Sequence, residues 1–172
     1  MFELYLLIFL LLIILLIVIT TLRVGISPMP SSKLVAKEML ELLKNSRDNT
    51  IIDLGSGFGG LAIFLASRLP EKKVIGYEIS FIPWLISIIL KKLLRLKNLE
   101  FYRKDFLKQE LKNASLVCYL FPKGMEKLEE KLFEDTINTT IISSTFAFRN
   151  IKERKIVKAS DIYKTPIFLY QT

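Results

Sequence analysis

The sequence of 172 residues contains no histidine and only one cysteine, Cys118. Without histidine the chain lacks the commonest general base, every catalytic triad built on histidine and the usual zinc ligand sets. We therefore expect no metal site. A single cysteine cannot form an internal disulfide, which suits a reducing compartment. These absences remove large groups of metal-dependent and triad-dependent enzymes from consideration.

Polar and charged residues are also missing near the start of the chain, where every residue from Leu4 to Ile19 is apolar. At about 1.5 Å per residue, a helix of roughly 20 such residues crosses a hydrocarbon core of about 30 Å. We therefore expect a transmembrane anchor over residues 1–24, a linker over 25–33 and a folded domain over 34–172. A cleaved signal peptide is the main alternative, but the start Met1-Phe2-Glu3 lacks its basic residues.

Basic residues follow this apolar run, at Arg23, Lys33 and Lys37. Because basic flanks favour the cytoplasmic side, we expect a single-pass protein of the cell membrane with its domain in the cytoplasm. The formal net charge of +8 leaves two interpretations open, an anionic lipid surface as partner or a solvated basic face without one. No RNA-binding signature or recognition-helix pattern accompanies the charge, so we expect no nucleic-acid partner.

Beyond the linker, apolar runs typical of strands alternate with patterns typical of helices. Helices are expected over residues 33–44, 61–69, 83–96 and 125–133, and strands over 50–55, 73–79, 99–106, 115–121 and 140–146. This alternation predicts a parallel sheet covered on both faces. Two further strand-like runs, 154–163 and 165–172, would finish the sheet as an antiparallel pair. The expected fold class is α/β, a Rossmann-like seven-stranded sheet.

The stretch IIDLGSGFGG, residues 51–60, fits two nucleotide-loop templates. Gly55, Gly57 and Gly60 match the GxGxxG of a dinucleotide turn, whereas Gly55, Gly57 and Gly59 match the GxGxG of an S-adenosylmethionine loop. Asp53 lies two residues before the loop, where a carboxylate would repel a pyrophosphate but suit a cationic amino group. Asp53 therefore favours S-adenosylmethionine as the cofactor.

Two more acids follow at the ends of the next expected strands. Glu78 lies about 20 residues beyond the glycines, where a carboxylate accepts hydrogen bonds from ribose hydroxyls. Asp105 could receive an adenine amino group, with Ile79 and Phe106 covering the ring; alternatively, Asp105 caps a following helix. Because the carboxyl ends of parallel strands meet at one edge, all three acids would lie where such sheets bind ligands.

Several of these stretches together resemble one family. DLGSGFGGLAIFLAS, VIGYEISFIPWL, EFYRKDF and VCYLFPKGMEKLEEKL resemble the membrane-anchored, seven-β-strand lysine methyltransferases that modify the ATP synthase c subunit and the adenine nucleotide translocase, a family with smaller prokaryotic members. The resemblance covers residues 28–171.

The resemblance implies donor contacts from Asp53, Glu78, Asp105 and the loop residues Gly55, Ser56, Gly57 and Gly59. It also implies a protein substrate with an accessible lysine, most simply on a membrane protein. The chain differs from the family's usual GDGR at Phe58 and Gly60.

Aromatic residues follow the fourth and fifth expected strands, where an acceptor would enter. Tyr119, Phe121 and Phe146 could line an apolar channel for a lysine, or they could be ordinary core residues. YLFP replaces the NPPY-type motif of amide and adenine methyltransferases, which argues against glutamine and DNA-base acceptors. Two alternatives stay open, a methyltransferase acting on a lipid or small apolar molecule and a non-catalytic membrane-tethered binding subunit.

The stretch FIPWLISIIL, residues 81–90, is almost wholly apolar and is followed by KKLLRLK. Ten residues are too few to cross a bilayer. The helix could rest at the headgroup level of a membrane or be buried against the sheet.

Overall fold

The computed structural model describes residues 3–11, 32–135, 137 and 139–171. Residues 3–11 are helical and their large apolar side chains are exposed. Most of the expected anchor, residues 1–2 and 12–24, and most of the expected linker lie outside this described part. Within it, every helix is too short or too polar to span a bilayer.

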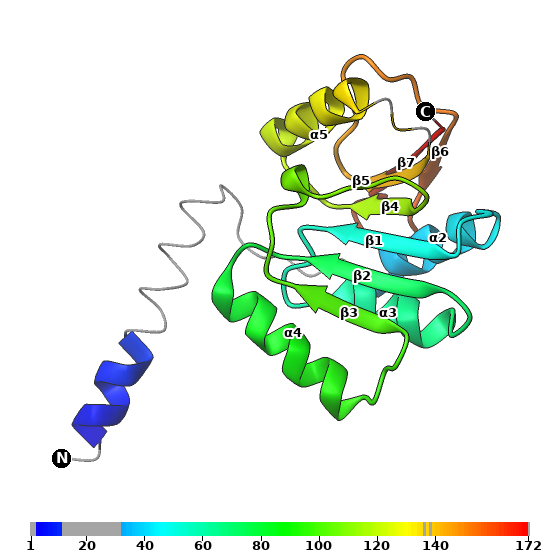
Figure 1. Ribbon diagram of the computed structural model, residues 1–172. Helices are drawn as coiled ribbons and strands as arrows, with labels where there is room; N and C mark the ends of the chain where they lie inside the picture. Colours follow the sequence, from blue (N-terminus) through cyan, green and yellow to red (C-terminus); the bar gives the residue numbers. More distant parts are fainter. Residues whose placement is uncertain (1–2, 12–31, 136, 138, 172) are drawn as a thin grey trace.

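One sheet of seven strands organises the domain (Figure 1), in the order β3-β2-β1-β4-β5-β7-β6. The strands are β1 (Thr50–Leu54), β2 (Lys73–Tyr77), β3 (Leu99–Tyr102), β4 (Ser115–Cys118), β5 (Thr140–Ser144), β6 (Lys155–Lys158) and β7 (Pro166–Gln171). The first five are parallel, while β7 pairs antiparallel with both β5 and β6. The expected Rossmann-like sheet with its antiparallel end is therefore confirmed.

The helices connect these strands close to the expected positions: α2 (Lys33–Lys44), α3 (Gly60–Arg68), α4 (Phe81–Leu93) and α5 (Pro122–Glu134), with a short 3₁₀ helix η1 (Phe106–Lys108). The Ser32 side chain begins α2 by accepting a hydrogen bond from the Val35 N–H at 3.2 Å. Helix α4 begins two residues before the predicted start, because Pro83 fits in a first helical turn, where its missing N–H is no loss.

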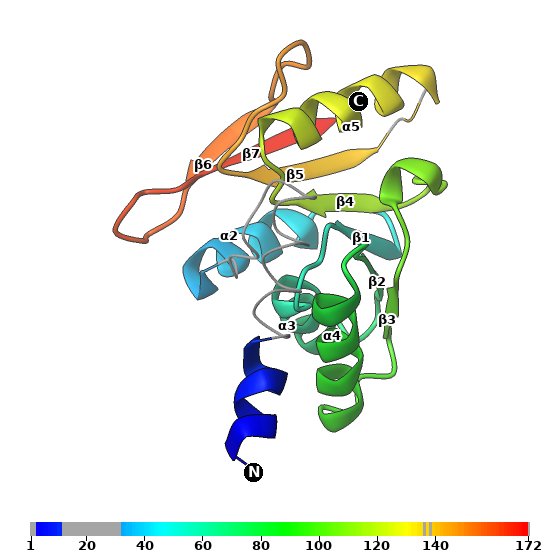
Figure 2. The ribbon, with the colours of Figure 1, turned by 90° about the vertical axis from the view of Figure 1, so that its left-hand side faces the viewer.

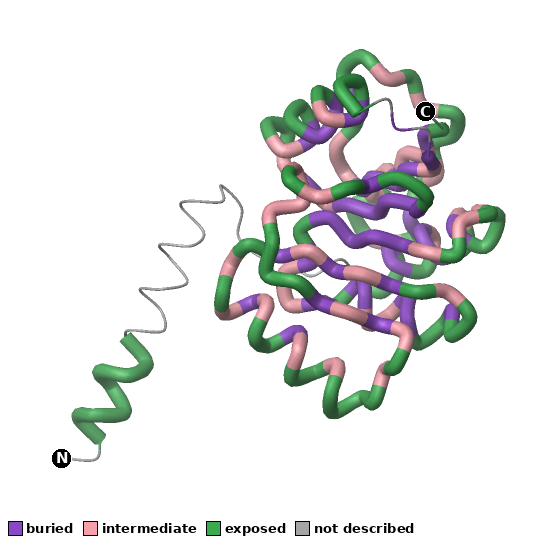
Figure 3. Tube along the Cα trace, in the orientation of Figure 1, coloured by how far each residue is buried: buried purple, intermediate pink, exposed green. Residues whose placement is uncertain are grey.

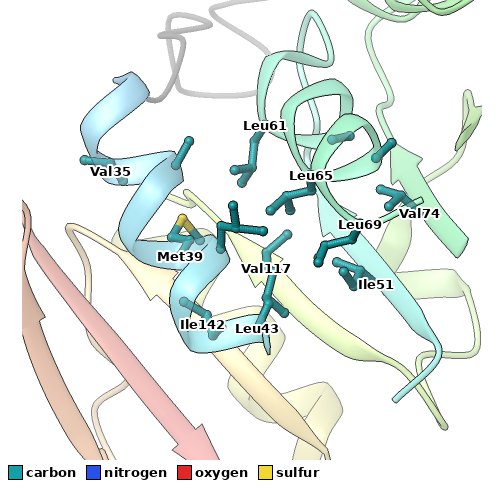
Figure 4. Close-up of a cluster of buried hydrophobic side chains, with 14 of the residues drawn as sticks. Val35, Met39, Leu43, Ile51, Leu61, Leu65, Leu69, Val74, Val117 and Ile142 are labelled. Carbon is teal, nitrogen blue, oxygen red and sulfur yellow. The ribbon is translucent and has the colours of Figure 1, made fainter. Parts of the chain in front are cut away.

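Side chains on the two faces of the sheet form two separate cores. On one face, α2 and α3 pack over Ile51, Val74, Val117 and Ile142 (Figure 4). On the other face, α5 packs through Met125, Leu128 and Leu132 against a second set that includes Leu116 and Ile141. Neighbouring residues of β1, Ile51 and Ile52, therefore belong to different cores, as the alternation of side chains along a strand requires.

Helix α4 is the exception to this burial. Only Pro83 and Ser87 are buried in it, and Trp84 and Ile88 are half-buried against the first core. Figure 3 shows α4 as exposed or intermediate over most of its length, whereas β1 and β4 are mostly buried. One side of α4 therefore packs against the sheet, as one of the two sequence interpretations expected, while its other side is exposed.

Candidate active site

The glycine loop leaves β1 at its carboxyl end and is held there by the backbone of β2. The N–H groups of Gly55 and Ser56 donate to the Tyr77 carbonyl oxygen at 3.0 and 2.8 Å. Gly55, Gly57 and Gly59 have φ values of +76°, +54° and +82°. These left-handed conformations favour glycine, so the loop requires glycine at these three positions.

Gly59 and Gly60 distinguish the two loop templates. A Cβ on Gly59 would lie 2.5 Å from Cζ of Phe101 and 2.9 Å from Cβ of Ser87. Gly60 opens α3, and a Cβ there would meet no atom within 4 Å. The loop thus uses the GxGxG set, and Gly60 has no comparable steric role.

Asp53 and Ser56 bring buried polar atoms without partners to this loop. Asp53 is 3% exposed and Ser56 is 8% exposed. Asp53 Oδ2 and Ser56 Oγ have no hydrogen-bond partner among the described residues. Buried polar groups are normally paired, so two such atoms beside one loop indicate a place where a polar ligand completes the pairing.

The surroundings of Asp53 also shift the pKa of its carboxyl group. Its pKa is raised to about 7, mainly because burial disfavours the charged form; a hydrogen bond from the Ala62 backbone N–H lowers the pKa, and the nearby Glu78 carboxylate adds to the rise. A cationic group placed beside Asp53 would favour the ionised form and relieve this desolvation.

Glu78 follows β2 and lies against the same loop. Its Oε2 accepts a hydrogen bond from the Gly57 N–H at 2.9 Å, and its Oε1 accepts one from the Ser80 N–H at 2.6 Å. Each carboxylate oxygen has a second lone pair, so Glu78 can still accept hydrogen bonds from a ligand. The carboxylate therefore fixes the loop and remains able to accept from vicinal hydroxyls.

Ile79 directly follows Glu78 after β2, while Asp105 and Phe106 follow β3. Asp105 Oδ1 caps η1 by accepting from the Leu107 N–H at 3.0 Å, which is the capping role that the sequence left open. Phe106 is half-buried against the second core, and Ile79 is exposed after β2. An exposed apolar side chain and a half-buried ring at this edge could cover a flat ligand.

The aromatic candidates follow β4 and β5 at the same edge of the sheet. The rings of Tyr119 and Phe146 lie 6.1 Å apart between centroids and are tilted by 34°. Both side chains are half-buried. Phe121 is the N-cap residue of α5, where its carbonyl oxygen accepts from the N–H groups of Gly124 and Met125. The structure therefore pairs two of the three candidates and gives the third a place at a helix start.

Two residues that hold the loop were absent from the sequence prediction. Gly76 leaves room in β2 for the Phe101 ring and for Ser56 Oγ, which would lie 2.9 Å from a Cβ at that position. A glycine inside a strand signals such a close approach, so this role was detectable. Tyr77 acts through its carbonyl oxygen, for which a side-chain pattern gives no signal.

A family model described as the ANTKMT methyltransferase domain matches residues 53–155, which include the glycine loop, Glu78, Asp105 and the aromatic pair. A protein-lysine N-methyltransferase of Saccharolobus islandicus is 27% identical over 141 residues, which are 77% of this chain and 84% of that protein.

A release factor glutamine methyltransferase of Buchnera aphidicola is 26% identical over 118 residues, 66% of this chain. The chain spans only 42% of that relative's length.

Among solved structures, an RNA methyltransferase from Salinibacter ruber in complex with S-adenosyl-L-homocysteine aligns with a TM-score of 0.73 and 26% identity, covering 83% of this chain and 93% of that one. The family match spans more than half of the chain and includes the glycine loop, Asp53 and Glu78. The chain belongs to the ANTKMT methyltransferase domain family of S-adenosylmethionine-dependent methyltransferases.

Proposed function

We propose that this protein transfers a methyl group from S-adenosylmethionine to a lysine side chain of a membrane protein. The observation that carries the proposal is that two buried atoms, Asp53 Oδ2 and Ser56 Oγ, find no partner in the part of the chain that the structure describes, beside a loop of left-handed glycines. Family membership and the similarity to a protein-lysine N-methyltransferase support lysine as the acceptor.

The residues present fit the donor. The Asp53 carboxylate would pair with its cationic amino group, and this pairing would satisfy Oδ2 and offset the raised pKa. Glu78 would accept from the ribose hydroxyls while keeping its bonds to the loop. Ile79, Asp105 and Phe106 are the groups proposed to surround the adenine. When bound, S-adenosylmethionine supplies the methyl group as an electrophile on a sulfonium.

The remaining task of the chain is to present a neutral amine in line with that methyl group and to exclude water. Removing a proton from lysine, whose reference pKa is about 10.4, costs roughly 4–5 kcal/mol at neutral pH. An apolar surrounding lowers this cost by desolvating the ammonium. The Tyr119–Phe146 pair, with Phe121 nearby in the sequence, is the proposed surrounding.

A membrane substrate is supported by the apolar run from Leu4 to Ile19, which we propose as a single-pass anchor within residues 1–24. The basic residues Arg23, Lys33 and Lys37 support a cytoplasmic domain after a short linker. Such an anchor would confine the site to the neighbourhood of membrane-embedded acceptors.

The test is incubation of the full chain with methyl-labelled donor and a membrane fraction, followed by separation of protein from lipid. We expect label in protein, with incorporation prevented by excess S-adenosylhomocysteine and strongly reduced in Glu78→Ala. Label in the lipid extract would instead support a lipid acceptor. Donor binding by calorimetry without any transfer would support the non-catalytic binding subunit.

A further inference from the structure

Helix α4 presents apolar side chains to solvent along its length. We define the α4 apolar face as Phe81, Leu85, Ile86, Ile89, Leu90 and Leu93, whose exposed fractions range from 36% to 72%. The spacing of these residues by three and four places them on one side of the helix. Helices that cover a sheet normally turn their apolar side inward, so this arrangement is unusual for a solvated surface.

The serine of the same helix points the other way. Ser87 is 0% exposed, and its hydroxyl donates to the Trp84 carbonyl oxygen at 2.7 Å. The helix buries its serine while Leu93 is 72% exposed, so part of its apolar surface is not used in packing against the sheet. This remaining apolar surface faces solvent, and Figure 3 shows α4 mainly as exposed and intermediate residues.

Positive charge borders this face. Six basic residues lie between positions 91 and 104, namely Lys91, Lys92, Arg95, Lys97, Arg103 and Lys104. The one acid in residues 81–104 is Glu100, which is paired with Lys73 at 3.1 Å. The surroundings of the α4 apolar face are therefore strongly cationic.

Two details place these charges beside the apolar side chains. The Arg103 guanidinium lies over the Phe81 ring at 5.6 Å from its centroid, at the start of the helix. At the other end of α4, Lys91 and the exposed Lys92 directly precede Leu93. An apolar stripe with cations at both ends matches a bilayer surface, whose acyl region lies beneath anionic headgroups.

We propose that the α4 apolar face is a bilayer-binding surface that lies in the headgroup region of an anionic lipid membrane. The apolar side chains enter the acyl boundary, and the six basic side chains contact headgroup phosphates. Because α4 begins three residues after Glu78, this orientation brings the start of α4 and the neighbouring carboxyl edge of the sheet beside the bilayer (α4 is in the foreground of Figure 2). The surface is independent of the anchor proposed for residues 1–24.

The test uses the full chain reconstituted into vesicles, with an environment-sensitive fluorophore attached at Leu93→Cys. Cys118 is completely buried, so the new thiol is the reactive one. The matched control is Ile162→Cys, since Ile162 is apolar, 96% exposed and in the β6–β7 connection. In vesicles containing phosphatidylglycerol, we expect a blue shift at position 93 and roughly twofold quenching by lipids with nitroxide-labelled acyl chains. Position 162 should show neither.

Equal emission and quenching at the two positions would overturn the proposal. A blue shift at 93 without lipid quenching would also overturn it, because another protein surface would then cover the face. Quenching that persists unchanged in pure phosphatidylcholine, or after Lys92→Glu with Arg95→Glu, would contradict the role of anionic lipid. Flotation of the chain with the vesicles tests the anchor separately. If the chain floats while the fluorophore at position 93 reports an aqueous environment, the anchor is supported and the bilayer-binding surface on α4 is refuted.

Discussion

At the carboxyl ends of β1 and β2 the candidate residues are buried carboxylates, whereas at the ends of β4 and β5 they are half-buried aromatic rings. Asp53 and Glu78 are 3% and 8% exposed, and backbone N–H groups hold Glu78 in place. The rings of Tyr119 and Phe146 contact each other, and Phe146 also packs against the second core. We call these regions the donor half and the acceptor half. Backbone hydrogen bonds fix the first, whereas the second consists of half-buried rings.

The largest effect is expected from Gly59→Ala in the donor half. Its φ of +82° and the close approach of Phe101 should lower the free energy of unfolding by about 3 kcal/mol or more. Gly60→Ala is the matched control and should change it by less than about 1 kcal/mol, because no atom lies near the new methyl group. Thermal unfolding followed by circular dichroism measures both, and equal effects would contradict the steric assignment of the loop.

Glu78→Gln should weaken donor binding about 10- to 100-fold, because hydrogen bonds to a charged group contribute roughly 1.5–3 kcal/mol. Glutamine keeps one carbonyl oxygen for a loop N–H, so this substitution disturbs the fold less than Glu78→Ala, which leaves two N–H groups unpaired. Glu100→Gln on β3 is the control and should bind the donor normally. If calorimetry gives Glu78→Gln an unchanged affinity, the ribose lies elsewhere.

Asp53 should make donor binding depend on pH. Its folded-state pKa of about 7 lies above the unfolded value of 3.8, so its ionisation costs stability as the pH rises from about 4 to about 7. The cationic donor binds the ionised form, and its affinity should therefore rise up to tenfold per unit between about pH 5.5 and pH 7. Calorimetric titrations over this range should show the rise, and Asp53→Asn should flatten it while weakening binding. A flat profile in the unmodified protein would refute the pairing.

The smallest effect is expected in the acceptor half. Phe146→Leu removes the ring contact with Tyr119, a kind of pair that contributes about 0.5–1.5 kcal/mol to packing, and should slow methyl transfer only modestly. Donor affinity should not change, since the donor half is intact. Tyr163→Leu, an 87% exposed aromatic outside the site, is the control. Loss of donor affinity in Phe146→Leu would show that the two halves are not separate.

The sheet was predictable because each buried strand is a short apolar run between helical patterns, and the antiparallel end followed from two adjacent runs at residues 154–172. Asp53 favoured the S-adenosylmethionine template from the sequence, but the steric requirement at Gly59 was not predictable, since it depends on φ and on the approach of Phe101, a residue more than 40 positions away. The second role of Glu78 was also hidden, because its partners are backbone N–H groups. Such contacts carry no signature in residue type.

The most direct test of the account is tandem mass spectrometry of the proteins that acquire label when the full chain acts on membranes. The account predicts methyl groups on lysine side chains of a membrane protein, with the yield falling in parallel with donor affinity in Glu78→Gln. Methyl groups found on glutamine, or a yield that is the same with and without the chain, would contradict it.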